Sequence, residues 1–170
     1  MDRPGFGPAS TFLSMWGGDE YHLGVRKVSA TRALQVWEGL ARVHSTMSAA
    51  IERDMVPNAG IPLSWYEVLA HLNRAPEAML RFQDLARLAG ITDSGASRRI
   101  EQMIKAGLID RHSCPADRRG AYAHLTPQGA DAYARAHSVF VRSLDRNLGR
   151  HLEPAEADAI SAALSRLAGS

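Results

Sequence analysis

The sequence is poor in cysteine and aromatic residues, and it has no long apolar run. It contains one Cys among 170 residues, and Phe, Trp and Tyr make up 6% of the chain. Because one cysteine cannot close an internal disulfide, the composition fits a reducing compartment. No apolar run approaches the ~20 residues of a membrane-spanning helix, and residues 11–16 are too few for the apolar core of a secretory signal. We therefore expect a cytoplasmic protein without membrane partners.

The chain also lacks the short motifs that accompany common enzyme chemistry. It contains no glycine-rich phosphate-binding loop, no HExxH pair of metal-binding histidines and no GxSxG nucleophile turn. No pair of carboxylates with an accompanying base suggests acid–base catalysis. These absences predict a protein that is not an enzyme and that needs no cofactor.

Amphipathic helical patterns fill most of the chain. Hydrophobic residues make up 45% of the sequence, enough to build a real core. Apolar residues spaced by three and four predict a long helix over about residues 29–55, which the segment 56–60 should end. Ser64 and Glu67 predict a capping box for a second helix that reaches about Asn73. The stripe of the long helix consists of Ala33, Trp37, Leu40, His44, Met47, Ile51 and Met55.

Three further helices are expected after these, apart from the polar-faced helix described next. Residues 81–89 have helical spacing, and the segment 90–91 predicts a turn. Thr126 is a candidate N-cap with Pro127 at the first helical position, and the pair at 153–154 starts a last helix. The stripes of the last two helices, like that of the long helix, are expected far from the polar-faced helix and the hairpin described below, and they predict either a bundle within one chain or an interface between two chains. Their members are Tyr133, His137, Phe140, Val141, Leu144 and Leu148, and then Ala159, Ile160, Ala163, Leu164 and Leu167.

The most informative stretch is a polar-faced helix over about residues 92–105. Thr92 is placed to act as its N-cap, and Gly107 supplies a C-terminal stop. One side is apolar and would attach to a core, whereas the other carries hydroxyls and a guanidinium that suit phosphates and base edges. The apolar side consists of Ala96, Ile100, Met103 and Ile104, and the polar side of Ser94, Ser97, Arg98, Glu101, Gln102 and Lys105.

A short β-hairpin with arginines at its tip is expected directly after this helix. Residues 108–109 and 122–125 are strand-like, and the segment between them is rich in turn-forming residues. Arg118 and Arg119 lie in that segment, and Asp117 can orient the guanidinium of Arg119. Beside a recognition helix such arginines can enter a minor groove, where the potential is most negative. Helix and hairpin together predict a winged helix-turn-helix.

The charge distribution agrees with this interpretation. Residues 81–119 hold eight basic and five acidic side chains, a net charge of +3, whereas the remainder of the chain carries a net charge of −1. A modestly basic module on a nearly neutral body is the electrostatic footprint expected of a DNA-binding protein.

The chain resembles the MarR family (multiple-antibiotic-resistance regulators) from about Ala33 to Ala168. The resemblance implies a mostly α fold with a small β-wing, in which a winged helix-turn-helix is embedded in a helical dimerisation domain. It also implies a homodimeric repressor that binds double-stranded DNA at a pseudo-palindromic operator with half-sites roughly 34–36 Å apart. The segments that carry it are 63–69, 85–86, 97–98, 106–109 and 117–120, the last followed by Leu125-Thr126 as its most specific part.

The resemblance also implies roles for individual residues. The polar face of the helix would lie in the major groove, and the hairpin tip would enter the minor groove with Arg119 braced by Asp117. Two positions depart from the family pattern, because Asp93 stands where a basic or neutral polar residue is common and Gly95 lacks a side chain. The predicted DNA-binding residues are Thr92, Ser94, Ser97, Arg98, Arg99, Asp117, Arg118 and Arg119.

The predicted organisation has three parts. Residues 1–28 form an N-terminal arm, since the first 24 residues contain five glycines and two prolines. Residues 29–60 and 126–170 form the helical dimerisation region, and residues 61–125 form the winged helix-turn-helix.

A small aromatic or phenolic effector is a further expected partner, because MarR proteins often bind such molecules between the dimer helices and the DNA-binding module. An aromatic cleft with an imidazole could accept a phenol or carboxylate. The same side chains could instead be ordinary core or interface residues. The predicted effector-binding residues are Trp37, His44, Met47, Trp65 and His71.

A metal- or thiol-responsive switch is the alternative to an effector pocket. Cys114 lies near arginines that would lower its pKa, and His112 and His124 are potential metal ligands. The spacing of His112 and Cys114 does not match a dedicated zinc motif, and thiol sensors of the resembled family usually place their cysteine in the N-terminal helix. We therefore expect no metal site of the common paired type.

Overall fold

The computed structural model describes residues 28–90, 92–114 and 117–169, and for residues 93, 113, 114 and 117–120 it describes the backbone only. The chain divides into two units, Met1–Gly39 and Leu40–Ser170. The described part of the first unit is the start of a long helix, and the predicted N-terminal arm falls almost wholly outside the described residues. The second unit is mostly helical and holds one small antiparallel sheet, which confirms the predicted fold class.

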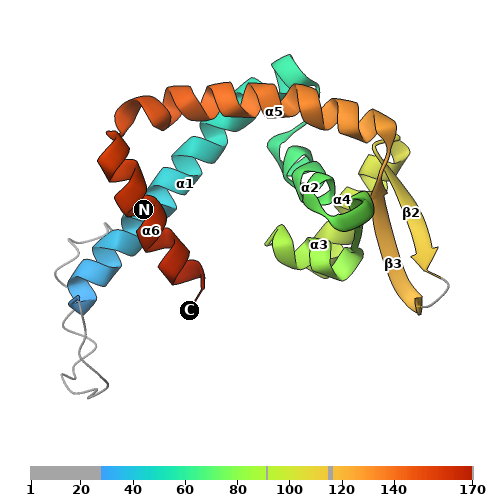
Figure 1. Ribbon diagram of the computed structural model, residues 1–170, viewed down its shortest axis with the longest axis horizontal. Coiled ribbons are helices and arrows are strands. Elements are labelled where there is room, and N and C mark those ends of the chain that lie inside the picture. Colours follow the sequence, from blue (N-terminus) through green and yellow to red (C-terminus); the bar gives the residue numbers. More distant parts are fainter. Residues whose placement is uncertain (1–27, 91, 115–116, 170) are drawn as a thin grey trace, which may run out of the picture. The chain divides into compact units, whose positions relative to one another are not determined.

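The order of elements follows the predicted order closely (Figure 1). No helix among the described residues is long and apolar enough to cross a membrane. The elements are α1 (Ala30–Ala59), α2 (Leu63–Arg74), the 3-10 turn η2 (Pro76–Ala78), β1 (Met79–Arg81), α3 (Phe82–Leu88), α4 (Asp93–Lys105), β2 (Ile109–Cys114), β3 (Asp117–Leu125), α5 (Pro127–Asn147), the 3-10 turn η3 (Gly149–His151) and α6 (Pro154–Ala168).

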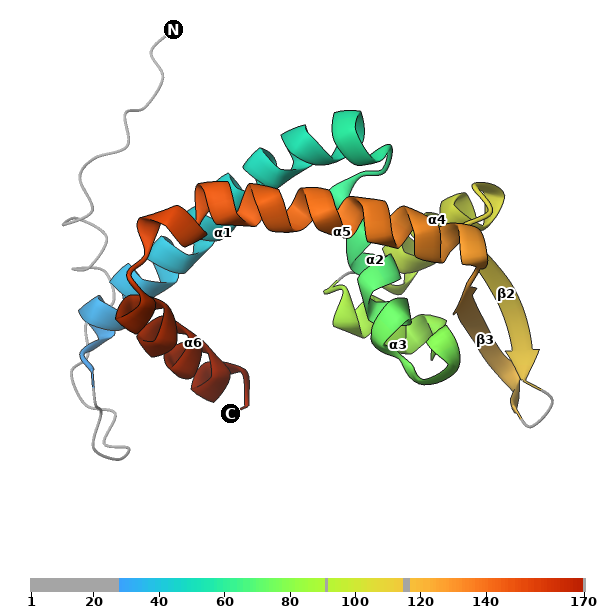
Figure 2. The same cartoon turned by 45° about the horizontal axis from the view of Figure 1, so that its top comes forward.

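The sheet has three antiparallel strands in the order β1-β3-β2, and its two long strands form the hairpin seen beside α4 in Figure 2. Strand β1, which the sequence did not lead us to expect, pairs Met79 with His124 and Arg81 with Tyr122. One face of the sheet belongs to the core, since Ile109 and Ala123 are completely buried. Because side chains alternate along a strand, the opposite face carries the intervening polar residues of β2 and β3.

Helix α1 continues one turn further than predicted. The segment 56–60 was expected to end it, and the helix does stop within that segment, at Ala59, after including Pro57; Gly60 follows with a φ of +75°. Because proline has no N–H, Pro57 cannot donate to the carbonyl of Arg53, so the last turn of α1 lacks one helical hydrogen bond. The extra turn also adds Ala59 to the core, in which Met55 directly before that turn is already buried.

The start of α2 is capped in a way that local sequence could not predict. The expected capping box of Ser64 and Glu67 is absent, because the helix begins at Leu63 with Pro62 in the N-cap position and no side-chain cap. Instead the backbone N–H of Leu63 donates to Oε2 of Glu52 on α1, at 2.7 Å. A carboxylate also interacts favourably with the positive end of the helix dipole, so Glu52 links α1 to α2.

Part of the apolar stripe of α5 packs against α2, which corrects the expectation that this stripe lies far from the DNA-binding module. The ring of Tyr66 on α2 lies 4.6 Å from that of Phe140 and 5.8 Å from that of Tyr133, between centroids. Its hydroxyl is 2.9 Å from Nδ1 of His137. The reason is the helix length: α5 has 21 residues, so its middle part, from Tyr133 to Phe140, packs on α2 while the helix extends beyond it.

Burial of Tyr66 gives a testable pH dependence. Burial, followed by the neighbouring Tyr133, raises the pKa of Tyr66 from 10.0 to about 12. The folded state therefore holds the phenol proton more tightly than the unfolded chain does, and this contribution to stability is complete below pH 10 and is lost as the pH rises towards 12. We expect Tyr66→Phe to cost about 1 kcal/mol at neutral pH, because it removes the hydrogen bond to His137.

The measurement is the free energy of unfolding of both proteins across the alkaline range. Between pH 10 and 12 the wild type should lose stability faster than Tyr66→Phe, so that the difference between them shrinks. Other tyrosines and lysines titrate in both proteins and cancel in the comparison. Parallel curves would show that Tyr66 is not the buried phenol described above.

Candidate nucleic-acid interface

Helix α4 has the polar face and the ends that its sequence predicts. The hydroxyl Oγ1 of Thr92 accepts the backbone N–H of Gly95 at 3.2 Å, the N-cap geometry. Ala96 is buried, and Ile100 and Met103 are completely so, which fixes the inner face. The helix ends before Gly107, whose φ of +72° suits glycine at this position.

The outer face of α4 presents hydrogen-bond donors to solvent. Ser94, Ser97 and Arg98 are exposed and Arg99 is half-buried. The Oγ atom of Ser94 lies 3.3 Å from the capping hydroxyl of Thr92, so these two hydroxyls form one small polar group at the N-terminus of the helix. Helix N-termini favour anions because unpaired N–H groups and the helix dipole point toward them.

The hairpin of β2 and β3 is longer than expected. The strands pair from Ile109 with Leu125 to Cys114 with Asp117, with an irregularity next to Cys114. Arg118 and Arg119, predicted to lie in the turn, therefore belong to β3, because the ladder continues almost to the tip. The side chains of the predicted wing residues Asp117, Arg118 and Arg119 are outside the described part of the chain.

A hydrogen-bonded clamp fixes the hairpin to α4 and α5. The hydroxyl of Thr126 donates to the carbonyl of Gly107 at 2.7 Å and accepts the N–H of Gly129 at 2.9 Å. The backbone N–H of Thr126 donates to the carbonyl of Leu108. Thr126 is thus the N-cap of α5, as predicted, and also holds the turn that joins α4 to β2. The clamp gives α4 and the hairpin a defined relative position.

Solved structures of related proteins share this architecture. Sco3205 of Streptomyces coelicolor, solved in complex with DNA, is 27% identical with a TM-score of 0.73, over 84% of this chain and 89% of that chain. AbsC of the same organism is 28% identical with a TM-score of 0.73, over 85% and 97%. Both are MarR family transcriptional regulators, and the MarR family model matches residues 59–120. The chain is therefore similar to MarR family regulators, and its residues 59–120 match that family.

The match to a curated protein is shorter. A protein of Thauera aromatica, whose name assigns it to transcriptional regulation of the hcr operon, is 32% identical over 83 residues. This match spans about half of the chain and about half of the relative, 49% of each. The resemblance to the MarR family that the sequence suggested is thereby confirmed.

The predicted effector-binding residues differ in their surroundings. Trp37 belongs to the first unit and its side chain is 69% exposed. His44 is exposed and Met47 is half-buried on α1, whereas Trp65 on α2 packs against the hydrophobic core. His71 is half-buried on the same helix. Trp65 is therefore at least partly a structural residue.

The residues of the alternative switch are partly brought together. The rings of His112 on β2 and His124 on β3 lie 5.0 Å apart between centroids. Cys114 lies at the end of β2, and its side chain is outside the described part of the chain. The side chain of Asp110 lies close to both histidines, although the sequence analysis did not identify Asp110 as a site residue. The signal that could have found it is the alternation of Asp110 and His112, which places both on the same face of a strand.

Proposed function

We propose that this protein is a sequence-specific transcriptional regulator that binds double-stranded DNA as a homodimer, acts as a repressor at a pseudo-palindromic operator and is released by a small aromatic effector. The observation that carries the proposal is the polar face of α4 held by the Thr126 clamp beside the β2–β3 hairpin. The related Sco3205 was crystallised with DNA, which supports the same use of the shared architecture here.

In this proposal the two parts of the winged module have different tasks. The exposed side chains of α4 approach base edges in the major groove, with Arg98 gripping a guanine and Ser94 and Ser97 contacting bases or phosphates. Thr92 and Arg99 lie at the flank of that surface and contact phosphates. Arg118 and Arg119 follow the hairpin into the minor groove, and Asp117 orients Arg119.

Selection of binding sites from a random pool of duplexes tests the proposal. The wild-type protein should enrich an inverted repeat whose half-site centres are about one helical turn, or a multiple of it, apart. Affinity for the selected site should fall steeply with salt, because phosphate contacts release counterions. Recovery of no common sequence after repeated rounds would leave only non-specific DNA binding and would refute the proposal.

The dimer part of the proposal is supported by exposed apolar side chains on two helices. Contiguous apolar surface on a folded chain commonly marks an interface. On α6, Ile160 and Leu164 are 44% and 42% exposed. On α1 the exposed large apolar residues are Leu34, Val36, Trp37, Leu40, Val43 and Val56. Burying these side chains against a second copy would remove them from water, at roughly 25 cal/mol for each Å².

Charges on α6 should therefore prevent dimerisation. We expect the double variant Ile160→Glu/Leu164→Glu to sediment as a monomer at micromolar concentration and to lose binding to the inverted repeat, because charged groups cannot be buried unpaired. Ser165→Glu, on an exposed position of the same helix, is the matched control and should remain dimeric. A wild type that sediments as a stable monomer would contradict this part of the proposal.

The effector part rests on the aromatic and imidazole groups named above. The proposed site for an aromatic anion is near Trp37, His44, Met47, Trp65 and His71. Such a ligand lowers DNA affinity if it binds more tightly to the dimer in which the spacing of the two winged modules does not match the operator. A tenfold loss of affinity needs ~1.4 kcal/mol of coupling. Titration of salicylate and other phenols should quench tryptophan fluorescence and release the selected duplex; a broad panel that does neither would remove the effector from the proposal.

A further inference from the structure

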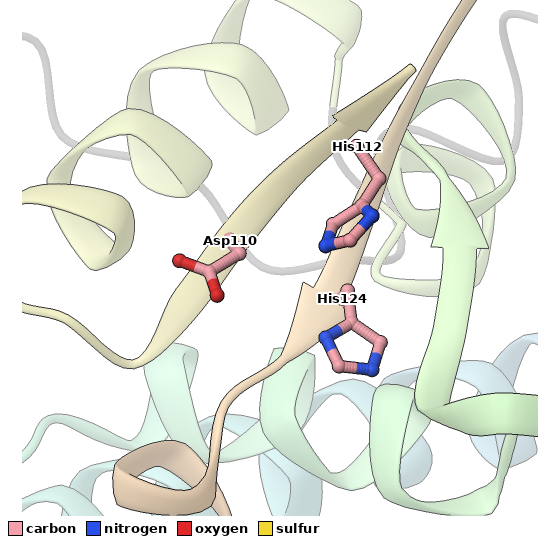
Figure 3. A group of neighbouring side chains, drawn as sticks. All are labelled: Asp110, His112 and His124. Atoms are coloured by element: carbon pink, nitrogen blue, oxygen red, sulfur yellow. The ribbon is translucent and has the colours of Figure 1, made fainter. Parts of the chain in front are cut away.

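Three potential metal ligands converge on one face of the hairpin. Asp110 and His112 alternate on β2, and His124 on β3 is the direct partner of Asp110 in the strand register. One ligand atom from each of the three side chains lies within 4.8 Å of the others. Figure 3 shows the carboxylate and the two imidazoles grouped beside the paired strands.

His124 carries an unsatisfied polar atom at this place. Its Nδ1 is buried and has no hydrogen-bond partner among the described residues. A buried nitrogen without a partner is costly and calls for an explanation such as an ion or a water. The imidazole of His112 is close to that of His124, with an angle of 56° between the ring planes, but it gives this Nδ1 no hydrogen bond.

We propose that Asp110, His112 and His124 bind a divalent transition-metal ion of the zinc type. Two imidazoles and one carboxylate are the donor set that such ions prefer, and three protein ligands leave a coordination position for water. Neighbouring ligand atoms around a tetrahedral zinc ion are ~3.3 Å apart, given bond lengths near 2.0–2.1 Å. Asp110 and His112 are exposed, so rotation of their side chains can close the remaining gap.

Arg81, a cationic side chain on the neighbouring strand β1, interacts with Tyr122. Arg81 is the β1 partner of Tyr122 on β3, and its Nε donates to the Tyr122 hydroxyl at 2.7 Å. Its guanidinium also lies 5.4 Å from the centroid of that ring. Tyr122 is in turn the register partner of His112. The guanidinium of Arg81 is thus bound to the hydroxyl and the ring of Tyr122, the residue paired with His112.

A bound ion would join the two strands of the wing. Because its ligands come from both β2 and β3, the ion stabilises the folded hairpin relative to the open one, by an amount that grows with the logarithm of the free ion concentration once this exceeds the Kd. The site is independent of the aromatic effector and of DNA, so metal binding can be measured on the protein alone.

The experiment uses the full-length chain without an affinity tag. Zn²⁺ is titrated by calorimetry, and Co²⁺ replaces it for visible absorption, which reports coordination by nitrogen and oxygen. We expect one ion per chain, with an affinity reduced at least tenfold in His112→Ala and in Asp110→Asn. Both positions are exposed, so circular dichroism should show an unchanged fold.

Two control variants separate this site from other ligands. His151→Ala removes an exposed histidine in η3, and Cys114→Ser removes the only thiol of the chain. Both should bind Zn²⁺ like the wild type. The proposal is overturned if the wild type binds neither ion, if binding survives in both His112→Ala and Asp110→Asn, or if Cys114→Ser alone abolishes it.

Discussion

Replacing Gly129 by alanine is expected to destabilise the protein by about 3 kcal/mol, the cost of forcing an atom into a filled interior. A Cβ at this position would overlap the carbonyl oxygen of Leu108 and would lie 2.8 Å from Cδ1 of Leu125. The Leu108 carbonyl cannot move away freely, because it accepts the N–H of Thr126. Relief therefore requires displacement of the turn that joins α4 to the wing.

Denaturant unfolding of the two proteins measures this effect. For a chain of this size the loss corresponds to a decrease of roughly 10 °C in melting temperature. Arg135→Ala, on an exposed position of the same helix, is the matched control and should change stability by less than about 0.5 kcal/mol. Equal stability of Gly129→Ala and the wild type would show that α5 does not approach the α4–β2 turn as described.

Arg98→Ala is expected to weaken binding to the selected duplex by ~1–3 kcal/mol for each base that the guanidinium grips, roughly 5- to 150-fold. The guanidinium is on the exposed face of α4, so its removal affects DNA binding without disturbing the core. Discrimination should relax at one base pair in each half-site. Arg119→Ala should weaken binding and also flatten the dependence on salt, because it removes a cationic group from the minor groove.

Fluorescence anisotropy on the selected duplex and on a scrambled one separates these effects. Arg142→Ala, on an exposed position of α5, removes the same charge outside the winged module and serves as the control. It should leave specific affinity within about twofold of the wild type, as expected of a surface position away from the bases. Unchanged affinity in both Arg98→Ala and Arg119→Ala would exclude the proposed docking of the module on DNA.

The sequence predicts best where a local pattern is sufficient. Thr92 and Thr126 are N-caps whose hydroxyls accept the N–H three residues later, and both were predicted from their immediate neighbours. The apolar spacing of Ile100 and Met103 likewise identified the buried side of α4. In these cases the interaction lies within one turn of helix, so the order of residues contains most of the information.

The sequence predicts poorly where the partner is distant along the chain. The cap of α2 comes from Glu52, eleven residues before Leu63 and on another helix. Tyr66 on α2 contacts His137 on α5, 71 residues later in the chain. Part of the apolar stripe of α5 is therefore covered by α2, which the sequence did not show. Strand β1 has three residues and exists because β3 offers an edge to pair with, which no local propensity reveals.

The candidate site shows the same division. The polar residues of α4 are local, and their spacing alone places them on one face of the helix. The convergence of Asp110, His112 and His124 needs the strand register, because residues 14 positions apart become direct partners only when β2 and β3 align. The sequence marked His112 and His124 as potential ligands, but Asp110 was missed, because the motif rules for metal sites are based on short spacings.

Photo-cross-linking to the selected duplex tests the central claim most directly. In a Cys114→Ser background, a cysteine with a photoreactive group is placed at Ser94 on α4 or at Ser165 on α6. The account predicts cross-links from position 94 to bases within each half-site, and none from position 165. Cross-linking that is absent at position 94, or equal at the two positions, would contradict a DNA-binding surface formed by α4.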